Sequence, residues 1–279
     1  MSDAETAYAK LNLALHVRRR REDGYHDIET LFAFCADGDE LSAEPADDLT
    51  LTIEGPFAGG LSSGADNLVL RAATALRDAA GIAAGAAIRL DKRLPVASGV
   101  GGGSADAAAA LRLLARLWRI DIAPERLHAL AAALGADVPA CLASRTCRGD
   151  ARGDRLTPVD GGALADTPVL LVNPRVAVPT GPVFAGWDRE DRGALAGGDP
   201  LAAALAGRND LEPPARVLAP LIAEAVALLA GGTGLRLARM SGSGATCFAL
   251  YVSDEARDDA AARIAGEKPH WWRSTTRLL

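Results

Sequence analysis

Alternating polar and apolar residues near the start of the chain predict a β-hairpin. The alternation covers Ala7 to Val17, and a second apolar run extends from Ile28 to Phe34. Between them stands Asp23-Gly24, a pair typical of tight turns because glycine adopts positive φ at no steric cost. We therefore expect two paired strands joined by a short turn.

Strand and helix patterns continue through the first half. Two short apolar runs predict strands, and two stretches with apolar residues three or four positions apart predict helices. The strands are expected at residues 49–53 and 87–90, and the helices at 66–80 and 124–134. Pro124 suits a first helical turn, and Gly135 ends the last of these helices.

The second half has a different order of elements. We expect strand, helix, strand, strand, helix and strand, at residues 169–173, 216–229, 235–240, 246–252, 254–265 and 272–278. This order is that of a ferredoxin-like split βαβ domain. The segment Phe184–Gly207, rich in Pro, Gly and Asp, is expected to be a long surface loop. Because the pattern restarts after the polar stretch 148–154, we expect two domains, 1–155 and 156–279.

Composition narrows the class of ligand. The chain has 279 residues, a net charge of −6 and a pI near 5.3, and its 30 basic residues are scattered. Nucleic-acid and membrane-surface partners are therefore disfavoured, and small-molecule ligands are favoured. The N-terminus has no signal-peptide pattern, no apolar run has membrane-spanning length, and the four cysteines match no metal or disulfide pattern. A cytoplasmic location is expected.

A glycine-rich loop that leads directly into a helix is the strongest chemical signal. Residues Gly99 to Ser104 read GVGGGS, and glycines let backbone amides at a helix start approach a phosphate. The alternative is a flexible linker, or an ordinary helix cap at Ser104. A P-loop is excluded because no lysine lies between Lys92 and Lys268. A Rossmann fingerprint is a weaker alternative because Ser104 stands where its third glycine is needed.

A second glycine loop, Ser241 to Ala245, joins two predicted strands. By itself it is typical of a tight β-turn. Three segments in order, however, namely Ala9-Lys10-Leu11-Asn12, the stretch PVASGVGGGSA at 95–105 and the loop at 241–245, resemble the three motifs of the GHMP kinase superfamily. The resemblance departs from the family pattern at Val100, where leucine is usual, and at Ala105, where a second serine is common.

The resemblance to GHMP kinases implies a fold and an activity. The implied fold is α+β with two domains: an N-terminal ribosomal-S5-domain-2-like nucleotide domain and a C-terminal ferredoxin-like domain. Four further segments are similar to one branch of the superfamily: AKLNL at 9–13, DGYH at 23–26, LGADVP at 134–139 and NDLE at 209–212. That branch uses ATP to phosphorylate the 2-hydroxyl of a cytidine-diphosphate-linked methylerythritol in the non-mevalonate isoprenoid pathway.

The resemblance also assigns roles to residues. It makes Lys10 and Asp137 the catalytic pair. From the residues alone, Asp137 is expected to cap the following helix and Lys10 to be a solvated strand lysine. The chain has only three lysines against 27 arginines, however, so a lysine on the first strand suggests that a compact ammonium group is needed.

The remaining candidates divide by ligand. For ATP they are Pro95, Val96, Ala97, Ser98, Gly99, Val100, Gly101, Gly102, Gly103 and Ser104. For the acceptor they are Asn12, Tyr25, His26, Thr180, Phe184, Asp210, Ser241, Gly242, Ser243 and Gly244, with Tyr25 and Phe184 sandwiching the cytosine. Mg²⁺ is expected to arrive with the nucleotide, since the sequence has no dedicated carboxylate cage for it. The sequence leaves monomer and homodimer open.

Two alternatives remain. Another GHMP kinase would act on homoserine, mevalonate or a sugar, but it would not need an aromatic pair such as that in DGYH. A non-catalytic nucleotide-binding relative is expected to have lost Lys10 or Asp137, and both are present.

Overall fold

The computed structural model describes residues 3–279 and divides into two compact units. The first unit contains residues 3–9, 37–96 and 101–144, and the second contains residues 10–36, 97–100 and 145–279. Each unit therefore gathers segments that are distant in sequence. The division into domains 1–155 and 156–279 stays a prediction.

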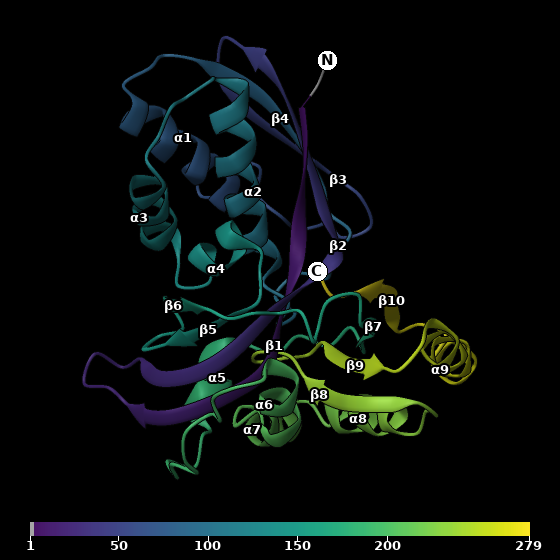
Figure 1. The fold of residues 1–279 in the computed structure, drawn as a ribbon. Helices are drawn as coiled ribbons and strands as arrows, with labels where there is room; N and C mark the ends of the chain where they lie inside the picture. Colours follow the sequence, from purple (N-terminus) through teal and green to yellow (C-terminus); the bar gives the residue numbers. More distant parts are fainter. Residues whose placement is uncertain (1–2) are drawn as a thin grey trace. The chain divides into compact units, whose positions relative to one another are not determined.

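The first unit places helices beside a small sheet (Figure 1). β3 (Leu49–Glu54) runs parallel to β4 (Gly85–Asp91), and β4 pairs antiparallel with the end of β2 (His26–Ala46). The helices are α1 (Leu68–Ala80), α2 (Gly102–Leu117), α3 (Pro124–Leu134) and α4 (Val138–Ala143). α1 and α4 pack against α2, whose Ala107–Ala110 are fully buried, because alanines allow close approach of helices.

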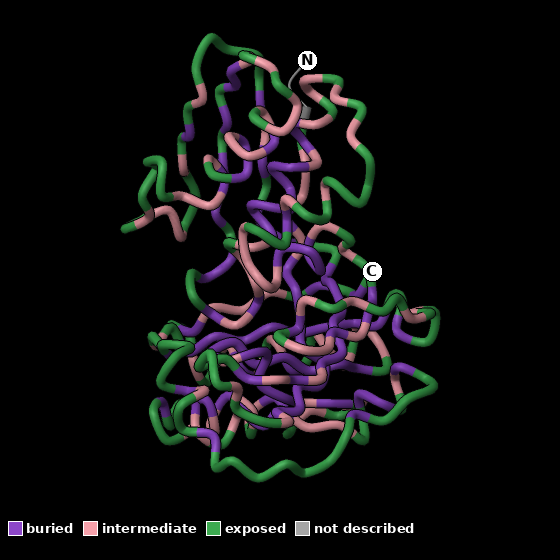
Figure 2. Tube along the Cα trace, turned by 90° about the vertical axis from the view of Figure 1, so that its left-hand side faces the viewer, coloured by how far each residue is buried: buried purple, intermediate pink, exposed green. Residues whose placement is uncertain are grey.

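The second unit contains the expected β-α-β-β-α-β domain. Its elements are β7 (Pro168–Asn173), α8 (Leu221–Ala230), β8 (Leu235–Met240), β9 (Cys247–Tyr251), α9 (Asp254–Glu267) and β10 (Trp272–Arg277). The four strands form an antiparallel sheet in the order β10-β7-β9-β8 (Figure 1). The two central strands, β7 and β9, are buried along their whole length, and buried segments gather inside the fold in Figure 2.

The predicted N-terminal hairpin is confirmed, but its strands are longer than expected. β1 (Asp3–Arg20) pairs with β2, and Arg21 N donates to Tyr25 O at 2.8 Å across the turn. Gly24 has φ of 86°, as the turn requires. Polar residues continue the strands beyond the alternating region because they pair across the hairpin, as Arg19 does with Asp27 at 2.6 Å.

Two short strands complete the second unit. β5 (Cys147–Asp150) pairs antiparallel with residues 30–32 of β2. β6 (Arg155–Pro158) in turn pairs antiparallel with β5. Neither strand is among the expected elements, because each has only four residues, too few for an alternating pattern to stand out.

Two expectations about the second half are wrong in part. The helix expected at 216–229 is two helices, α7 (Glu212–Leu218) and α8, because Pro220 lacks the amide needed to continue α7. The loop expected at 184–207 contains the end of α5 (Thr180–Ala185) and all of α6 (Pro200–Ala206). Asp199 caps α6 by accepting a hydrogen bond from Ala202 N at 2.7 Å, a start signal that the Pro/Gly composition obscured.

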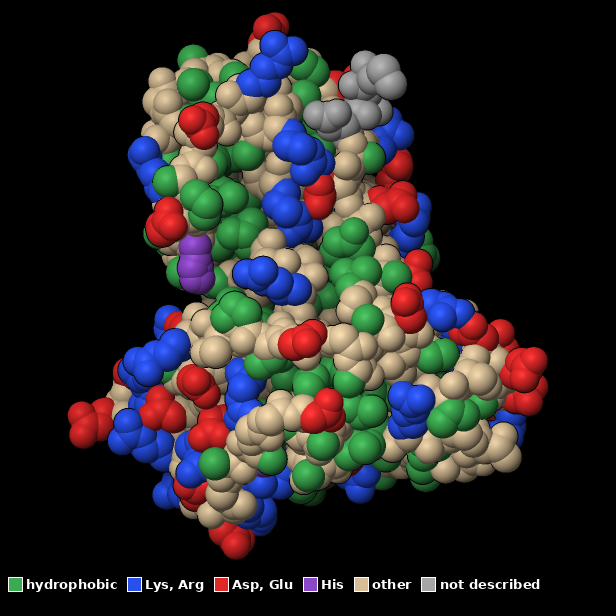
Figure 3. Space-filling view, viewed as in Figure 1, with side chains coloured by type: hydrophobic (Ala, Val, Ile, Leu, Met, Phe, Trp, Pro, Cys, Tyr) green, Lys and Arg blue, Asp and Glu red, His purple; other side chains and the backbone are tan. Residues whose placement is uncertain are grey.

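The surface carries charges of both signs. Figure 3 shows basic and acidic side chains interspersed over the face drawn. Arg93, for example, pairs with Asp91 and Glu40, each at 2.7 Å. Among the described helices, none is both long and apolar enough to span a membrane.

A buried arginine joins three parts of the second unit. The guanidinium of Arg239 on β8 donates to the carbonyl oxygens of Leu13 on β1, Ala204 on α6 and Gly207 after α6, the last two at 2.9 and 2.6 Å. Burial lowers the pKa of Arg239, but the three carbonyls satisfy its donors. These bonds tie α6 to the strands.

We expect Arg239→Met to lower the free energy of unfolding by about 2 kcal/mol or more, because buried carbonyls lose their donor. Urea unfolding followed by circular dichroism measures the loss. The matched control is Arg236→Met on the exposed side of the same strand, with an expected change within about 0.5 kcal/mol. Equal stability of the two variants would contradict this account of Arg239.

Candidate active site

The second unit brings together parts of the three segments that resemble GHMP kinase motifs: the first strand, the first glycine loop and the second glycine loop. Lys10 N donates to Val100 O at 2.9 Å, which places the first strand beside the first glycine loop. Ser98 O accepts from Thr246 N at 2.9 Å, which places the same loop beside the second. Asn12 N donates to Ser241 Oγ at 3.1 Å, which closes the set.

Ser241 is the bridge between these segments. Its hydroxyl accepts from Asn12 N and donates to Gly99 O at 2.8 Å, and the residue is fully buried. The approach is close enough to require glycine: a Cβ on Gly99, whose φ is 80°, would lie 2.3 Å from Ser241 O. A Cβ on Gly242 would lie 3.1 Å from Gly99 O and 3.3 Å from Asn12 Oδ1. The turn at 241–245 is thus also a packing contact for the loop at 97–100.

Lys10 is buried, so the expectation of a solvated strand lysine is wrong. Its side chain is 3% exposed, its Nζ donates to Asn12 Oδ1 at 2.9 Å, and it lies 5.0 Å from the centre of the Phe32 ring. Asn12 Nδ2 donates to Thr30 Oγ1 at 2.8 Å, and that hydroxyl donates to Ala14 O at 2.7 Å. This chain orients the amide of Asn12 with its oxygen toward the ammonium group. The role of Thr30 was not foreseen, because a threonine in a strand carries no signal.

The first unit contains Asp137, Pro95, Val96 and the residues 101–104. Gly101, with φ of 68°, is the N-cap of α2 and Ser104 lies inside the helix, so the alternative that Ser104 caps the helix is excluded. The amides that begin α2 have no intrahelical acceptors, as at every helix start. Asp137 occupies the N-cap of α4, but its side chain makes no capping hydrogen bond. Lys10 and Asp137 belong to different units, so their pairing stays a prediction.

The aromatic candidates are arranged differently from the expected sandwich. The ring of His26 contacts Phe184, with centroids 5.1 Å apart and planes inclined by 34°. The ring of Trp187 is nearly perpendicular to that of His26, with centroids 5.8 Å apart. Tyr25 is 56% exposed, and the guanidinium of Arg152 lies 5.2 Å from its ring centre. Phe184 is therefore paired with His26 here, and a cytosine role for these rings stays a prediction.

Three acceptor candidates make hydrogen bonds within the second unit. Thr180 Oγ1 and Ser243 Oγ share a hydrogen bond of 3.0 Å and are both accessible enough to meet a ligand. Asp210 accepts from Val17 N at 2.8 Å and from Arg208 Nε at 2.7 Å, so its carboxylate positions protein groups. Its contact with a substrate stays a prediction.

Asn209 is a residue that sequence reasoning undervalued. Its Nδ2 donates to the carbonyl oxygens of Met240 and Gly242, both at 2.8 Å, and thereby shapes the second glycine loop. Its position as the first residue of the NDLE segment is the sequence feature that points to it.

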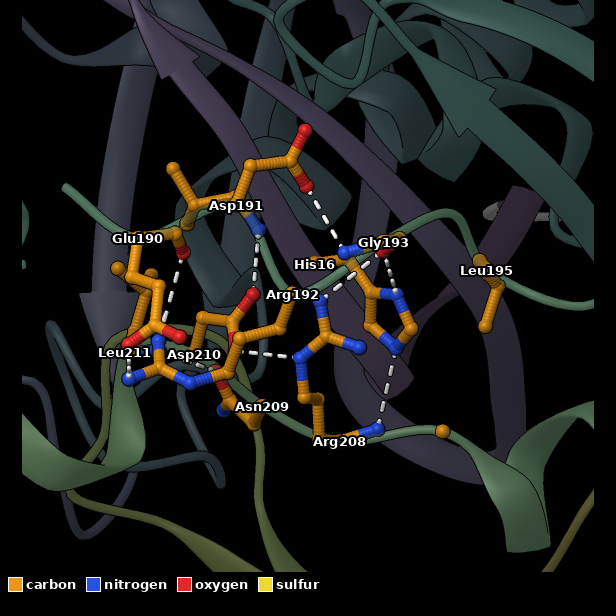
Figure 4. Close-up of polar contacts among 12 residues, drawn as sticks. His16, Glu190, Asp191, Arg192, Gly193, Leu195, Arg208, Asn209, Asp210 and Leu211 are labelled. Atoms are coloured by element: carbon orange, nitrogen blue, oxygen red, sulfur yellow. Dashed lines mark hydrogen bonds and ion pairs between the residues drawn. The ribbon is translucent and has the colours of Figure 1, made fainter.

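The segment between α5 and α6 is fastened to β1 by His16 (Figure 4). His16 Nδ1 lies 3.1 Å from Gly193 O and its Nε2 accepts from Arg208 N at 3.2 Å, which requires a neutral ring protonated at Nδ1. Arg18 adds an ion pair with Asp191 at 3.1 Å. Burial, and next the charge of Arg208, lower the pKa of His16 below its ordinary value.

Acidification is expected to weaken the hydrogen bonds that His16 makes with Gly193 and Arg208. Because the folded pKa of His16 is below its unfolded value of about 6.5, its contribution to stability is present above that pH and is lost as pH falls below it. Urea midpoints measured from pH 8 to pH 5.5 are expected to fall more steeply in the wild type than in His16→Gln. A residual slope remains because burial also lowers the pKa of His26. The control is His128→Gln, which replaces an exposed histidine and is expected to match the wild type. Equal pH dependence of the urea midpoint in the wild type and in His16→Gln would contradict the role of His16.

Comparison with known proteins identifies related sequences along the whole chain. Residues 67–145 match the model of the GHMP kinases N terminal domain, and residues 194–269 match that of the GHMP kinases C terminal. A protein of Rhizorhabdus wittichii named 4-diphosphocytidyl-2-C-methyl-D-erythritol kinase is 62% identical, with 100% of this chain and 95% of the relative covered. A protein of the same name from Cereibacter sphaeroides is 49% identical, with 98% of each chain covered.

Solved structures agree with the sequence relatives. The crystal structure of a 4-(cytidine 5'-diphospho)-2C-methyl-D-erythritol kinase is 36% identical to this chain, with a TM-score of 0.79 and 99% of each chain covered. A homoserine kinase from Cytophaga hutchinsonii has a TM-score of 0.71 at 18% identity, which shows a common fold alone. By its matches along the full length, this chain belongs to the GHMP kinases and, within them, to the family of the 4-diphosphocytidyl-2-C-methyl-D-erythritol kinases.

Proposed function

We propose that this chain transfers the γ-phosphate of ATP to the 2-hydroxyl of 4-(cytidine 5'-diphospho)-2-C-methyl-D-erythritol. The observation that carries the proposal is the contact of the first strand, the first glycine loop and the second glycine loop around Ser241. The names of full-length relatives at 49–62% identity supply the acceptor.

The glycine-rich loop is the proposed phosphate cradle. Gly101 starts α2 without a side chain, so the first amides of the helix are accessible to an anion from the N-terminal side. The positive end of the helix dipole favours phosphate at this place. In this proposal residues 95–104 bind ATP, and Ser104 contributes a hydroxyl.

Lys10 and Asp137 are the proposed catalytic pair. Phosphoryl transfer requires orientation of the acceptor hydroxyl and a late proton acceptor, for which an ordinary carboxylate suffices. Asp137 takes that proton in the proposal. Lys10 offsets the negative charge that develops between the acceptor oxygen and the phosphate, and Asn12 directs its ammonium group.

The described residues do not form a metal site made of protein side chains alone. Within residues 3–279, no group of three or more His, Cys, Asp or Glu side chains is arranged to hold a metal ion. Mg²⁺ bound to ATP would neutralise charge on its phosphates, and we propose that it arrives with the nucleotide.

The acceptor is proposed to bind along residues of the second unit. The His26–Phe184 pair and the exposed Tyr25 offer aromatic faces for cytosine, and Thr180 and Ser243 offer hydroxyls. A homoserine kinase and a mevalonate kinase share the fold at 18% and 12% identity. Similarity at this level does not indicate that this chain uses their acceptors.

An acceptor panel tests the proposed function. ADP release is expected with the cytidine-diphosphate-linked methylerythritol, and not with mevalonate, homoserine or galactose. The uridine analogue is expected to have at least about tenfold lower kcat/KM, because exchanging an amino donor for a carbonyl leaves buried polar groups mismatched. Equal values for the two analogues would overturn the cytidine assignment but not the kinase assignment.

Replacement of Tyr25 tests the proposed contact with cytosine. Tyr25→Ala removes an exposed ring without disturbing the core, so it is expected to raise KM for the cytidine acceptor while leaving KM for ATP unchanged.

Replacement of Asp137 tests the proposed base. Asp137→Asn is expected to lower kcat about 100-fold or more while ATP binding persists, because an amide cannot take the hydroxyl proton. Steady-state ADP release and nucleotide titration measure the two effects. The control is Asp121→Asn, an exposed carboxylate of the same unit, which is expected to keep wild-type kcat. A kcat near wild type for Asp137→Asn would remove Asp137 from the mechanism.

A further inference from the structure

A buried cluster of three charged side chains lies at the start of α2. Lys92, directly after β4, donates from Nζ to Asp39 Oδ2 at 2.5 Å and to Asp106 Oδ2 at 2.6 Å. The three side chains are 3%, 0% and 5% exposed. Lysine is rare in this chain, and the argument that a lysine indicates a need for an ammonium group applies to Lys92 as it does to Lys10.

The two carboxylates of the cluster are not equivalent. Asp39 Oδ1 accepts from Arg93 N at 2.6 Å and from Leu94 N at 2.7 Å, so both of its oxygens are satisfied. Asp106 Oδ1 is buried and has no hydrogen-bond partner. The environment of Asp39 therefore stabilises the ionised carboxylate. One oxygen of Asp106, in contrast, is removed from water without gaining a hydrogen bond.

The charges of the cluster do not balance when both carboxylates are ionised. One ammonium faces two carboxylates, which leaves one negative charge in a dry environment. α1, α3 and α4 also pack against α2, and their buried side chains are aliphatic apart from one thiol: Val69, Ala72, Ala73, Leu76, Ala131, Val138, Pro139, Ala140 and Cys141. Farther along α2, Arg112 is engaged by Glu5 at 2.7 Å. No further cation among these groups offsets the surplus.

A proton removes the imbalance. Burial, together with the charge of Asp39, raises the pKa of Asp106 to about 7 in spite of Lys92. The two carboxylates outweigh burial at Lys92 and raise its pKa, so the ammonium stays charged. Near neutral pH the cluster therefore exchanges one proton, and Asp106 holds it.

The cluster touches the backbone that is proposed to bind phosphate. A Cβ on Gly102 would lie 3.0 Å from Lys92 Nζ and 3.6 Å from Asp39 Oδ2. Asp106 follows Gly102 by four residues, one helical turn farther along α2. An ionised Asp106 would offset the positive end of the helix dipole, which would otherwise attract phosphate, and would repel a polyphosphate. A protonated Asp106 does neither.

We propose that Asp106 is a positioning residue whose proton, held on its carboxyl group beside Lys92, makes nucleotide binding at the start of α2 proton-coupled. The inference rests on the proposed phosphate role of the glycine-rich loop. Binding of a nucleotide polyphosphate takes up a proton from solvent onto the Asp106 carboxylate, and deprotonation at higher pH weakens the binding. By linkage, the nucleotide and the proton each favour the binding of the other.

Calorimetric titration of Mg·ADP into the full chain tests this coupling between pH 7 and 8.5. In the wild type we expect proton uptake on binding, seen as a heat that varies with the ionisation enthalpy of the buffer. The affinity is expected to fall with pH by up to about tenfold per unit, the limit for one coupled proton. Asp106→Asn, which is isosteric and cannot titrate, is expected to bind with little pH dependence and no uptake.

A matched control and three outcomes distinguish failure of the inference from failure of the proposed function. Asp78→Asn removes an exposed carboxylate of α1 and is expected to keep the wild-type pH dependence. Binding by the wild type without proton uptake, a measurement that needs no variant, would overturn the inference alone. Identical pH dependence in wild type and Asp106→Asn would do the same. Absence of nucleotide binding to the wild type at every pH would overturn the proposed function as well.

Discussion

The hydroxyl of Ser241 joins segments that are more than a hundred residues apart in sequence. It accepts from the backbone of Asn12 and donates to the carbonyl of Gly99, and it is fully buried. A hydroxyl is suited to this place because it is donor and acceptor at once. The closeness of the backbones on either side explains why glycines surround it. The orientation of Asn12, and through it of Lys10, depends on this contact.

Much of this arrangement could be predicted from the sequence. Periodicity predicted the N-terminal hairpin, α1, α3 and, in the second half, the four strands and α9, but not α5, α6 or the division of α7 from α8. The resemblance to the three GHMP kinase motifs implied that the segments containing Lys10, Gly99 and Ser241 belong together. These predictions succeeded because alternation, helical spacing and glycine runs are local properties of a chain.

The partners of polar side chains could not be predicted in this way. Thr30 and His16 look like ordinary strand residues, and their roles come from atoms far along the chain, such as Gly193 O for His16. The pairing of His26 with Phe184, in place of Tyr25, depends on which face of a turn each ring occupies. The charge imbalance around Asp106 likewise arises only when a strand end and a helix start meet. Such contacts are set by tertiary packing, on which local patterns are silent.

The two long N-terminal strands have a consequence for dissecting this protein. Residues 3–9 and 37–46 of β1 and β2 belong to the first unit, whereas residues 10–20 and 26–36 belong to the second. A protease or a stop codon that acts at one point therefore cannot release either unit intact. A fragment beginning after residue 155 would lack Lys10, Asn12 and Gly99 together with the strands that bear them. Exchange of halves between relatives would meet the same obstacle, since the N-terminal half carries parts of both units and the C-terminal half carries only part of the second.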